Sequence, residues 1–200
     1  MCPRAPRPPA LLALARRFLR DEGGSIAVES MLIMPALFWC YMGVFVFFDA
    51  FRAESINVKA AYTIGDVLSR ETGFITPEYM DSLYSLQGVL TATTQTRRMR
   101  VTVINFQELN DRYAVRWSRT RGGATELTTA SLAALRSRIP EMDDGEIAVV
   151  TETWMNYAPA FDVGIDPFTF QDLVVTRPRF ASQLCWNSLN DGGGPGTAIC

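Results

Sequence analysis

The carboxylate of Glu29 stands directly before a long apolar run and calls for a chemical explanation. The 19 residues from Ser30 to Phe48 carry no charge, close to the roughly 20 residues that span the hydrocarbon core of a bilayer. An ionised side chain at the centre of a membrane costs about 2.5–3.5 kcal/mol on insertion scales, and less near an interface. Glu29 therefore either keeps a hydrated head at the membrane surface or finds a cationic partner within the apolar layer.

The chain contains no histidine, which removes most common forms of side-chain catalysis. Ser-His-Asp and Cys-His arrangements and all His-containing zinc sites are excluded. The only lysine, Lys59, has no paired serine motif around it, so a Ser-Lys hydrolase is disfavoured. Asp143, Asp144 and Glu146 are interpreted as a solvated turn and not as a calcium site. We therefore expect a protein that is not an enzyme and that uses no cofactor or metal.

The charge of the chain is unevenly distributed. Residues 1–24 carry five arginines against Asp21 and Glu22, a net charge of +3, so the total of −2 leaves −5 for the remainder. A basic flank beside an apolar run orients that flank toward the cytoplasm. No basic patch or recognition motif follows, so a nucleic-acid partner is not expected. The sequence predicts a single-pass inner-membrane protein with its N-terminus cytoplasmic and its C-terminal part periplasmic or extracellular.

Two of the four cysteines, Cys185 and Cys200, lie near the end of the chain, on the expected outer side where oxidation is permitted. A bridge between them would close a loop of 16 residues (185–200) and stabilise by roughly 3 kcal/mol in the chain-entropy model. Two unpaired thiols remain the alternative. Cys2 and Cys40 stand apart from this pair and complete no zinc pattern.

The first half of the chain reads as helix. One long helix is expected from Ser25 to about Glu71, apolar all round at first and amphipathic afterwards. Pro35 predicts a kink within it, because proline removes one backbone hydrogen bond. Thr76 followed by Pro77 is typical of a helix start and predicts a second helix to about Val89.

The period then changes to that of strands. Alternation over 98–106 and 113–118 predicts an antiparallel hairpin, 127–139 reads as a helix, and 146–157 reads as a long third strand. Residues from 158 onward show no clear period and are expected to be loop with short strands. The predicted fold class is α+β: a transmembrane helix that continues into an amphipathic helix, then a small head with an antiparallel sheet of about three to four strands.

These elements divide the chain into four expected regions. They are a basic cytoplasmic leader (1–24), a transmembrane helix (25–51), a helical stalk (52–92) and an extracytoplasmic α+β head (93–200).

The residues around the junction of Gly24 and Ser25 resemble a type IV prepilin leader: basic residues, glycine, a small polar residue, a glutamate and an apolar helix. In that class a membrane-embedded prepilin peptidase cuts after the glycine. The resemblance implies that Ser25 becomes the first residue and that Glu29 becomes the fifth. The new α-ammonium of one subunit could then be neutralised by Glu29 of a neighbour, and an unpaired buried charge would disfavour other packing registers.

The stretch GSIAVESMLIMPAL (24–37) resembles the start of the TadE/TadG-like family of tight-adherence (Flp) pilus systems, typically G-S-x-A-V-E-F-A-L-x-x-P. Ser30 departs from the family pattern, which has Phe or Tyr there. The strand segments, including the ending with Tyr157, Pro159 and Phe161, are also similar to that family. The D-x-S-x-S metal motif of larger members is absent. The matching N-terminal residues are Gly24, Ser25, Ala27, Val28, Glu29 and Pro35.

The resemblance implies a pilin-like head and a structural role as a minor pilin or pseudopilin. Its implied partners are the inner membrane, the prepilin peptidase, other pilin-like subunits and the pilus assembly machinery. Ala36, Cys40 and Gly43 form a helix flank of small side chains that would admit a close neighbour, but their interpretation as ordinary membrane residues is favoured. The alternative function is an uncleaved, signal-anchored envelope protein whose head binds a secretion or envelope partner, and for which Glu29 is only interfacial.

Overall fold

The computed structural model describes residues 25–189 and 198–200, and the chain from Ser25 begins directly as helix. The described chain forms two units, one up to Val46 and one from Phe47. The elements, in chain order, are α2 (Ser25–Ser69), α3 (Pro77–Thr91), β1 (Arg97–Gln107), η2 (Glu108–Asn110), β2 (Arg112–Arg121), α4 (Thr129–Leu132), η3 (Ala133–Arg138), β3 (Ile147–Tyr157), β4 (Phe168–Thr176), β5 (Trp186–Asn187) and β6 (Ala198–Ile199).

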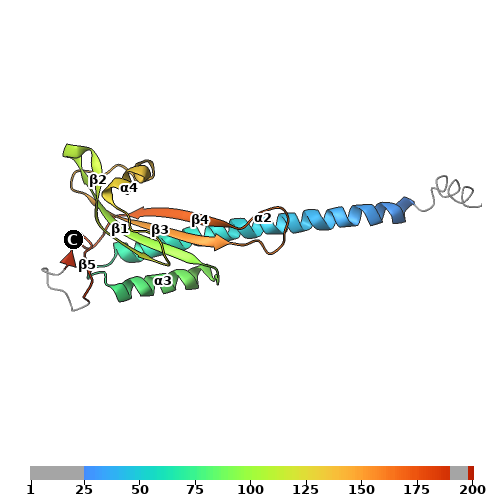
Figure 1. The fold of residues 1–200 in the computed structure, drawn as a ribbon, viewed down its shortest axis with the longest axis horizontal. Helices are drawn as coiled ribbons and strands as arrows, with labels where there is room; N and C mark the ends of the chain where they lie inside the picture. Colours follow the sequence, from blue (N-terminus) through green and yellow to red (C-terminus); the bar gives the residue numbers. More distant parts are fainter. Residues whose placement is uncertain (1–24, 190–197) are drawn as a thin grey trace, which may run out of the picture. The chain divides into compact units, whose positions relative to one another are not determined.

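The fold is α+β, as predicted, and its centre is a four-stranded antiparallel sheet in the order β2-β1-β3-β4. β1 and β2 form the expected hairpin, with a register shift between Val103 and Ile104. β1 also pairs with β3, and β3 pairs with β4. Because every pair is antiparallel, the β1–β2 turn and the β3–β4 connection lie at opposite ends of the sheet (Figure 1).

Each face of the sheet has its own core. On one face, Met99, Val101 and Val103 of β1 pack with Ile64 and Leu68 of α2, and Met80 and Leu83 of α3 complete this core. On the other face, the segment with α4 and η3 covers the end of the sheet near the β1–β2 turn (Figure 1). Burial of apolar side chains on both faces supplies the main driving force for this three-layer head.

The part of α2 that belongs to the head lies close to the sheet. Asn57, Ala60, Ile64 and Leu68 are buried, spaced three or four residues apart as one helical face requires. Gly65 allows α2 to lie close to β4, because a Cβ at this position would lie 3.1 Å from Cγ2 of Thr176 in β4. The hydroxyl of Thr176 donates to the carbonyl of Gly65 over 3.3 Å.

The helices start and stop largely where the sequence predicts. α2 ends at Ser69, two residues before the expected end at Glu71. Thr76 caps α3 as expected, since its side chain accepts from the backbone N–H of Tyr79, and Pro77 opens the helix. α2 is assigned as one continuous helix through Pro35, so the expected kink stays a prediction.

The prediction of a helix over 127–139 is wrong in its extent. Only Thr129–Leu132 is α-helical, and Ala133–Arg138 is a 3-10 helix. The reason lies in the side chains that this segment buries. Leu127 and Leu132 both enter the second core, and two residues five apart point away from one another on an α-helix. Thr128 therefore starts the helix after Leu127, through a capping box with Ser131.

The expectation of loop and short strands after residue 158 is wrong for Phe168–Thr176, a nine-residue edge strand. Its period is hidden because polar residues lie on both faces. Asp172 faces α2, where the amide of Asn57 donates to its carboxylate over 2.5 Å, while Gln171 lies on the opposite face. Of this strand only Val174 is fully buried, so composition alone cannot reveal it.

Replacing Gly122 with alanine is expected to destabilise the head strongly, whereas Gly123→Ala serves as a matched control. Both glycines have positive φ, 75° and 82°. A Cβ at Gly122 would lie 2.2 Å from the carbonyl oxygen of Arg97, and a Cβ at Gly123 meets nothing within 4 Å. Backbone strain alone costs about 1–2 kcal/mol, so thermal unfolding should show that loss for Gly123→Ala and a clearly larger one for Gly122→Ala. Equal losses would contradict the steric argument.

Candidate functional site

The apolar first part of α2 is the most unusual surface of the described chain. Among the described residues, one helix, Ile26–Ser69, is long and apolar enough to cross a membrane. Its large apolar side chains are exposed: Ile26 and Met31 are each 80% exposed, and Leu32 is 72% exposed. Monomeric soluble proteins rarely expose so large a continuous apolar surface. Such a surface is suited to contact with lipid or with another protein chain.

Glu29 lies in the second turn of α2, inside this apolar segment. Its side chain is exposed, and no basic side chain of the described residues pairs with it. Ser25 is the first helical residue, and Pro35 lies inside the helix. Gly24 and the whole leader 1–24 lie outside the described residues. The cleavage junction is therefore described only on its Ser25 side.

The boundary between the apolar run and the head is marked by Asp49. The hydroxyl of Tyr157, at the end of β3, donates to Oδ2 of Asp49 over 3.0 Å. Burial raises the pKa of Tyr157 to about 12, and the hydrogen bond to Asp49 acts in the same direction. The phenol thus stays protonated and remains a donor at any physiological pH. This contact ties the first charged residue after the apolar run to the sheet.

An apolar groove of about 230 Å³ lies beside the same stretch of α2. Phe168 and Phe170 of β4 form one wall, with ring centroids 4.8 Å apart, and both rings also contact Tyr157. Phe161 and Phe168 are exposed, at 44% and 41%, so neither ring belongs to the buried core of the sheet. The alternation of phenylalanines at 168 and 170 was the signal that could have placed them on one strand face. The groove is lined by Phe47, Ala50, Phe51, Glu54, Ile165, Phe168 and Phe170.

A second groove, of about 320 Å³, lies on another side of α2 and is more polar. Asp49, Arg52 and Ile56 of α2 line it together with the end of α3 and the end of β3. Its lining also includes Tyr157, so the hydrogen bond from Tyr157 to Asp49 lies at this groove.

The acidic turn after α4 does not gather its carboxylates. Asp144 accepts from the backbone N–H of Glu108 over 2.9 Å, and Glu146 forms an ion pair with Arg177. Within residues 25–189 and 198–200, no group of three or more histidine, cysteine or acidic residues could hold a metal ion.

Cys185 and Cys200 form a disulfide. It links residues 198–200 to Cys185, whose backbone carbonyl accepts a hydrogen bond from the backbone N–H of Ile75 over 2.9 Å. Trp186, the next residue, pairs with Ile199 across the short sheet of β5 and β6. The bridge therefore joins the connection between α2 and α3 to the end of the chain.

Cys200→Ser is expected to lower the stability of the head by about 3 kcal/mol, because the unfolded chain regains the freedom of a loop that spans residues 185–200. The measurement is thermal unfolding of the detergent-solubilised chain with and without a reductant. Cys40→Ser is the matched control, since Cys40 is an exposed free thiol in the apolar segment. Unfolding that is insensitive to both the substitution and the reductant would contradict the bridge's role.

Comparison with protein-family models, with curated proteins and with solved structures finds no match for this chain.

Proposed function

We propose that this chain is a pilin-like structural protein, a minor pilin or pseudopilin of a tight-adherence (Flp) type IV pilus, anchored in the inner membrane by α2. The proposal extends the sequence resemblance to the TadE/TadG-like family. The observation that carries it is a single carboxylate, Glu29, on the exposed surface of the first part of α2, where residues 25–48 carry no other charge. Lipid alone explains the apolar side chains of that helix, but it gives no reason for a carboxylate within the first two turns.

The proposed mechanism is assembly through helix packing after leader cleavage. Cleavage after Gly24 would leave the α-ammonium of Ser25 at the start of α2. Within apolar packing, the ammonium of one subunit would be neutralised by Glu29 of a neighbour. Removing either partner from a buried pair costs about 3–5 kcal/mol, so registers that leave a charge alone are rejected.

The head would be displayed outside the membrane at the end of this helix. The burial of Asn57, Ala60, Ile64 and Leu68 against the sheet supports an amphipathic continuation of α2. In this proposal the two parts of α2 have different surroundings. The first, apolar part packs with lipid or with neighbouring subunits, and the later part belongs to the core of the head. The head, an α+β unit with a four-stranded antiparallel sheet, is consistent with a pilin-like identity.

The test is the N-terminal residue of the protein taken from membranes of its native host, measured by intact mass. A chain that starts at Ser25 is the expected result. A chain that starts at Met1 or Cys2 would contradict processing. Gly24→Leu should abolish the shortening, whereas Gly23→Ala, the matched control at the neighbouring glycine, should leave it unchanged.

The second candidate function is an uncleaved, signal-anchored envelope protein whose head binds a partner. The observation that favours it is the position of Glu29 in the second turn of α2, near the expected cytoplasmic interface, where its carboxylate could remain hydrated. The same mass measurement separates the two functions, since this candidate requires the full-length chain.

A further inference from the structure

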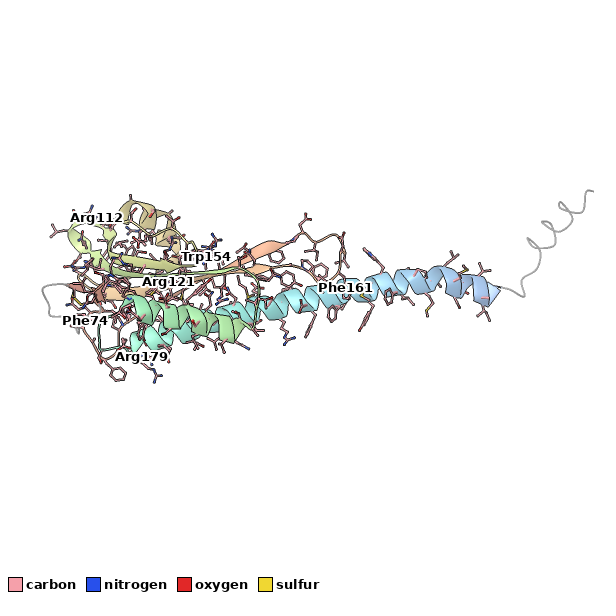
Figure 2. All side chains as sticks on the ribbon, turned by 60° about the horizontal axis from the view of Figure 1, so that its bottom comes forward. Phe74, Arg112, Arg121, Trp154, Phe161 and Arg179 are labelled. Atoms are coloured by element: carbon pink, nitrogen blue, oxygen red, sulfur yellow. A yellow bond between two sulfur atoms is a disulfide. The ribbon has the colours of Figure 1, made fainter. Side chains whose placement is uncertain are left out.

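The connection between β3 and β4, residues 158–167, lies beside α2 where the charge-free run ends. Figure 2 shows Phe161 next to α2, at the end of the head opposite Arg112 of the β1–β2 hairpin. The hydrogen bond from Tyr157 to Asp49 fixes the start of this connection against the helix. Ile165 and Phe168 line the apolar groove with Phe47 and Phe51, which fixes its end. The connection is thus held at one level along α2.

That level coincides with the expected edge of the hydrocarbon core. The charge-free run ends at Phe48, and Asp49 is the first charged residue after it. Phenylalanine, like tryptophan and leucine, is typical of the apolar face with which interfacial segments enter the boundary between headgroups and acyl chains. Here five phenylalanines are exposed in one region of the described chain: Phe47 at 57%, Phe48 at 72%, Phe51 at 66%, Phe161 at 44% and Phe168 at 41%.

The charges around the groove indicate which kind of surface it fits. The connection contains Asp162 and Asp166, both exposed, and no lysine or arginine. An anionic surface would repel these carboxylates, so contact must come from the aromatic and aliphatic side chains. Glu54 is the only charged residue among those that line the groove, and the others are apolar. An apolar wedge flanked by hydrated carboxylates fits the interface of a zwitterionic lipid layer.

We infer that Phe161 of the β3–β4 connection and Phe168 at the start of β4 insert into the outer lipid interface, so that lipid fills the groove formed with Phe47 and Phe51. This inference rests on the membrane anchoring in the proposed function. It gives the head a second attachment to the membrane besides α2. An unassembled subunit would then hold the base of its sheet at the lipid surface, and release of this wedge would accompany any departure of the subunit from the membrane.

The test places spin labels on the full chain in phosphatidylcholine vesicles and compares collisions with oxygen, which concentrates in lipid, and with a water-soluble nickel complex. One label is placed on the native Cys40 in a C2S chain. The others follow Ala160→Cys and Leu109→Cys in a C2S, C40S chain. Ala160 is exposed beside Phe161, and Leu109, fully exposed, lies in the β1–β2 turn at the far end of the sheet.

The labels on Cys40 and at position 160 should collide more with oxygen, and the label at position 109 more with nickel. Phe161→Ser combined with Phe168→Ser should shift the label at position 160 to nickel. Phe180→Ser, a control at a more exposed phenylalanine (70%) outside this region, should not. Adding phosphatidylglycerol should not increase oxygen contact at position 160, because the connection carries no cation.

Each contrary result has a distinct meaning. A nickel-accessible label at position 160, with Cys40 in lipid, would overturn the wedge and leave the anchor intact. A nickel-accessible Cys40 would overturn the anchoring itself. Exclusion of both reagents at position 160 would mean that a second copy of the chain, and not lipid, covers the groove.

Discussion

Glu29→Ala is expected to leave a stable, membrane-inserted and correctly shortened protein that fails to enter assemblies with its partner subunits. The substitution removes one carboxylate from the exposed apolar part of α2 and changes no contact of the head. Insertion should improve, because a charged residue is removed from an apolar run. Assembly should fail, because the α-ammonium of the neighbouring subunit would be buried without a partner, at a cost of about 3–5 kcal/mol.

The measurement is the amount of this protein in sheared surface filaments relative to the amount in membranes. Glu54→Ala is the matched control, an exposed carboxylate on the same helix but beyond the charge-free run. Glu29→Asp, which keeps the charge on a shorter side chain, should retain part of the incorporation into filaments. Normal incorporation of Glu29→Ala would contradict charge pairing and favour an interfacial role for this glutamate.

Arg100→Met is expected to produce the largest loss of stability in the head. Glu152 of β3 is fully buried, and both Nε and Nη2 of Arg100 lie 2.6 Å from its Oε2. Nη1 of Arg100 also donates to the carbonyl of Thr125 over 2.8 Å, which adds a further attachment. Removing the guanidinium would leave a buried carboxylate without its cation. Such a loss costs about 3–5 kcal/mol, or roughly 10 °C in the unfolding midpoint of a chain of this size.

A double substitution separates the ion pair from simple packing. Arg100→Met with Glu152→Leu should recover most of the lost stability, because replacing both members of a buried pair with apolar groups is often nearly neutral. Arg119→Met is a matched control, since Arg119 pairs with the more exposed Glu126, and pairs of that kind contribute about 0–1 kcal/mol. Equal losses for the single and double variants would mean that packing of the Arg100 side chain dominates. Thermal unfolding in detergent measures all three.

The sequence predicts elements well where one physical signal dominates. The strand over 98–106 alternates up to Val103, because Met99, Val101 and Val103 all face the helices. The start of α3 is set by Thr76 and Pro77, whose local chemistry is sufficient by itself. Both predictions agree with the structure to within a residue or two, since neither depends on what lies elsewhere in the chain.

The predictions fail where tertiary contacts override local pattern. The edge strand β4 has polar residues on both faces. The carboxylate of Asp172 accepts a hydrogen bond from Asn57, which lies 115 residues away in the sequence, so no local pattern indicates that Asp172 faces α2. The aromatic wall of the groove combines the exposed ring of Phe168 with the half-buried ring of Phe170, and a sequence does not separate these two states. The candidate assembly residues Gly24, Ser25 and Glu29 come from a short motif, which carries no information about the surface that β4 adds beside α2.

The first core has a consequence for export. It joins Ile64 of α2 to Leu184 and Trp186 near the end of the chain, and the indole N–H of Trp117 donates to the carbonyl of Leu184 over 2.7 Å. Contacts between residues so distant in sequence form late and slowly. Under the proposed function, in which the head is exported after α2, this core could close only once Leu184 and Trp186 have crossed the membrane. Until then the sheet would lack the C-terminal residues that cover this face, and any factor that binds the head would meet a partly folded domain.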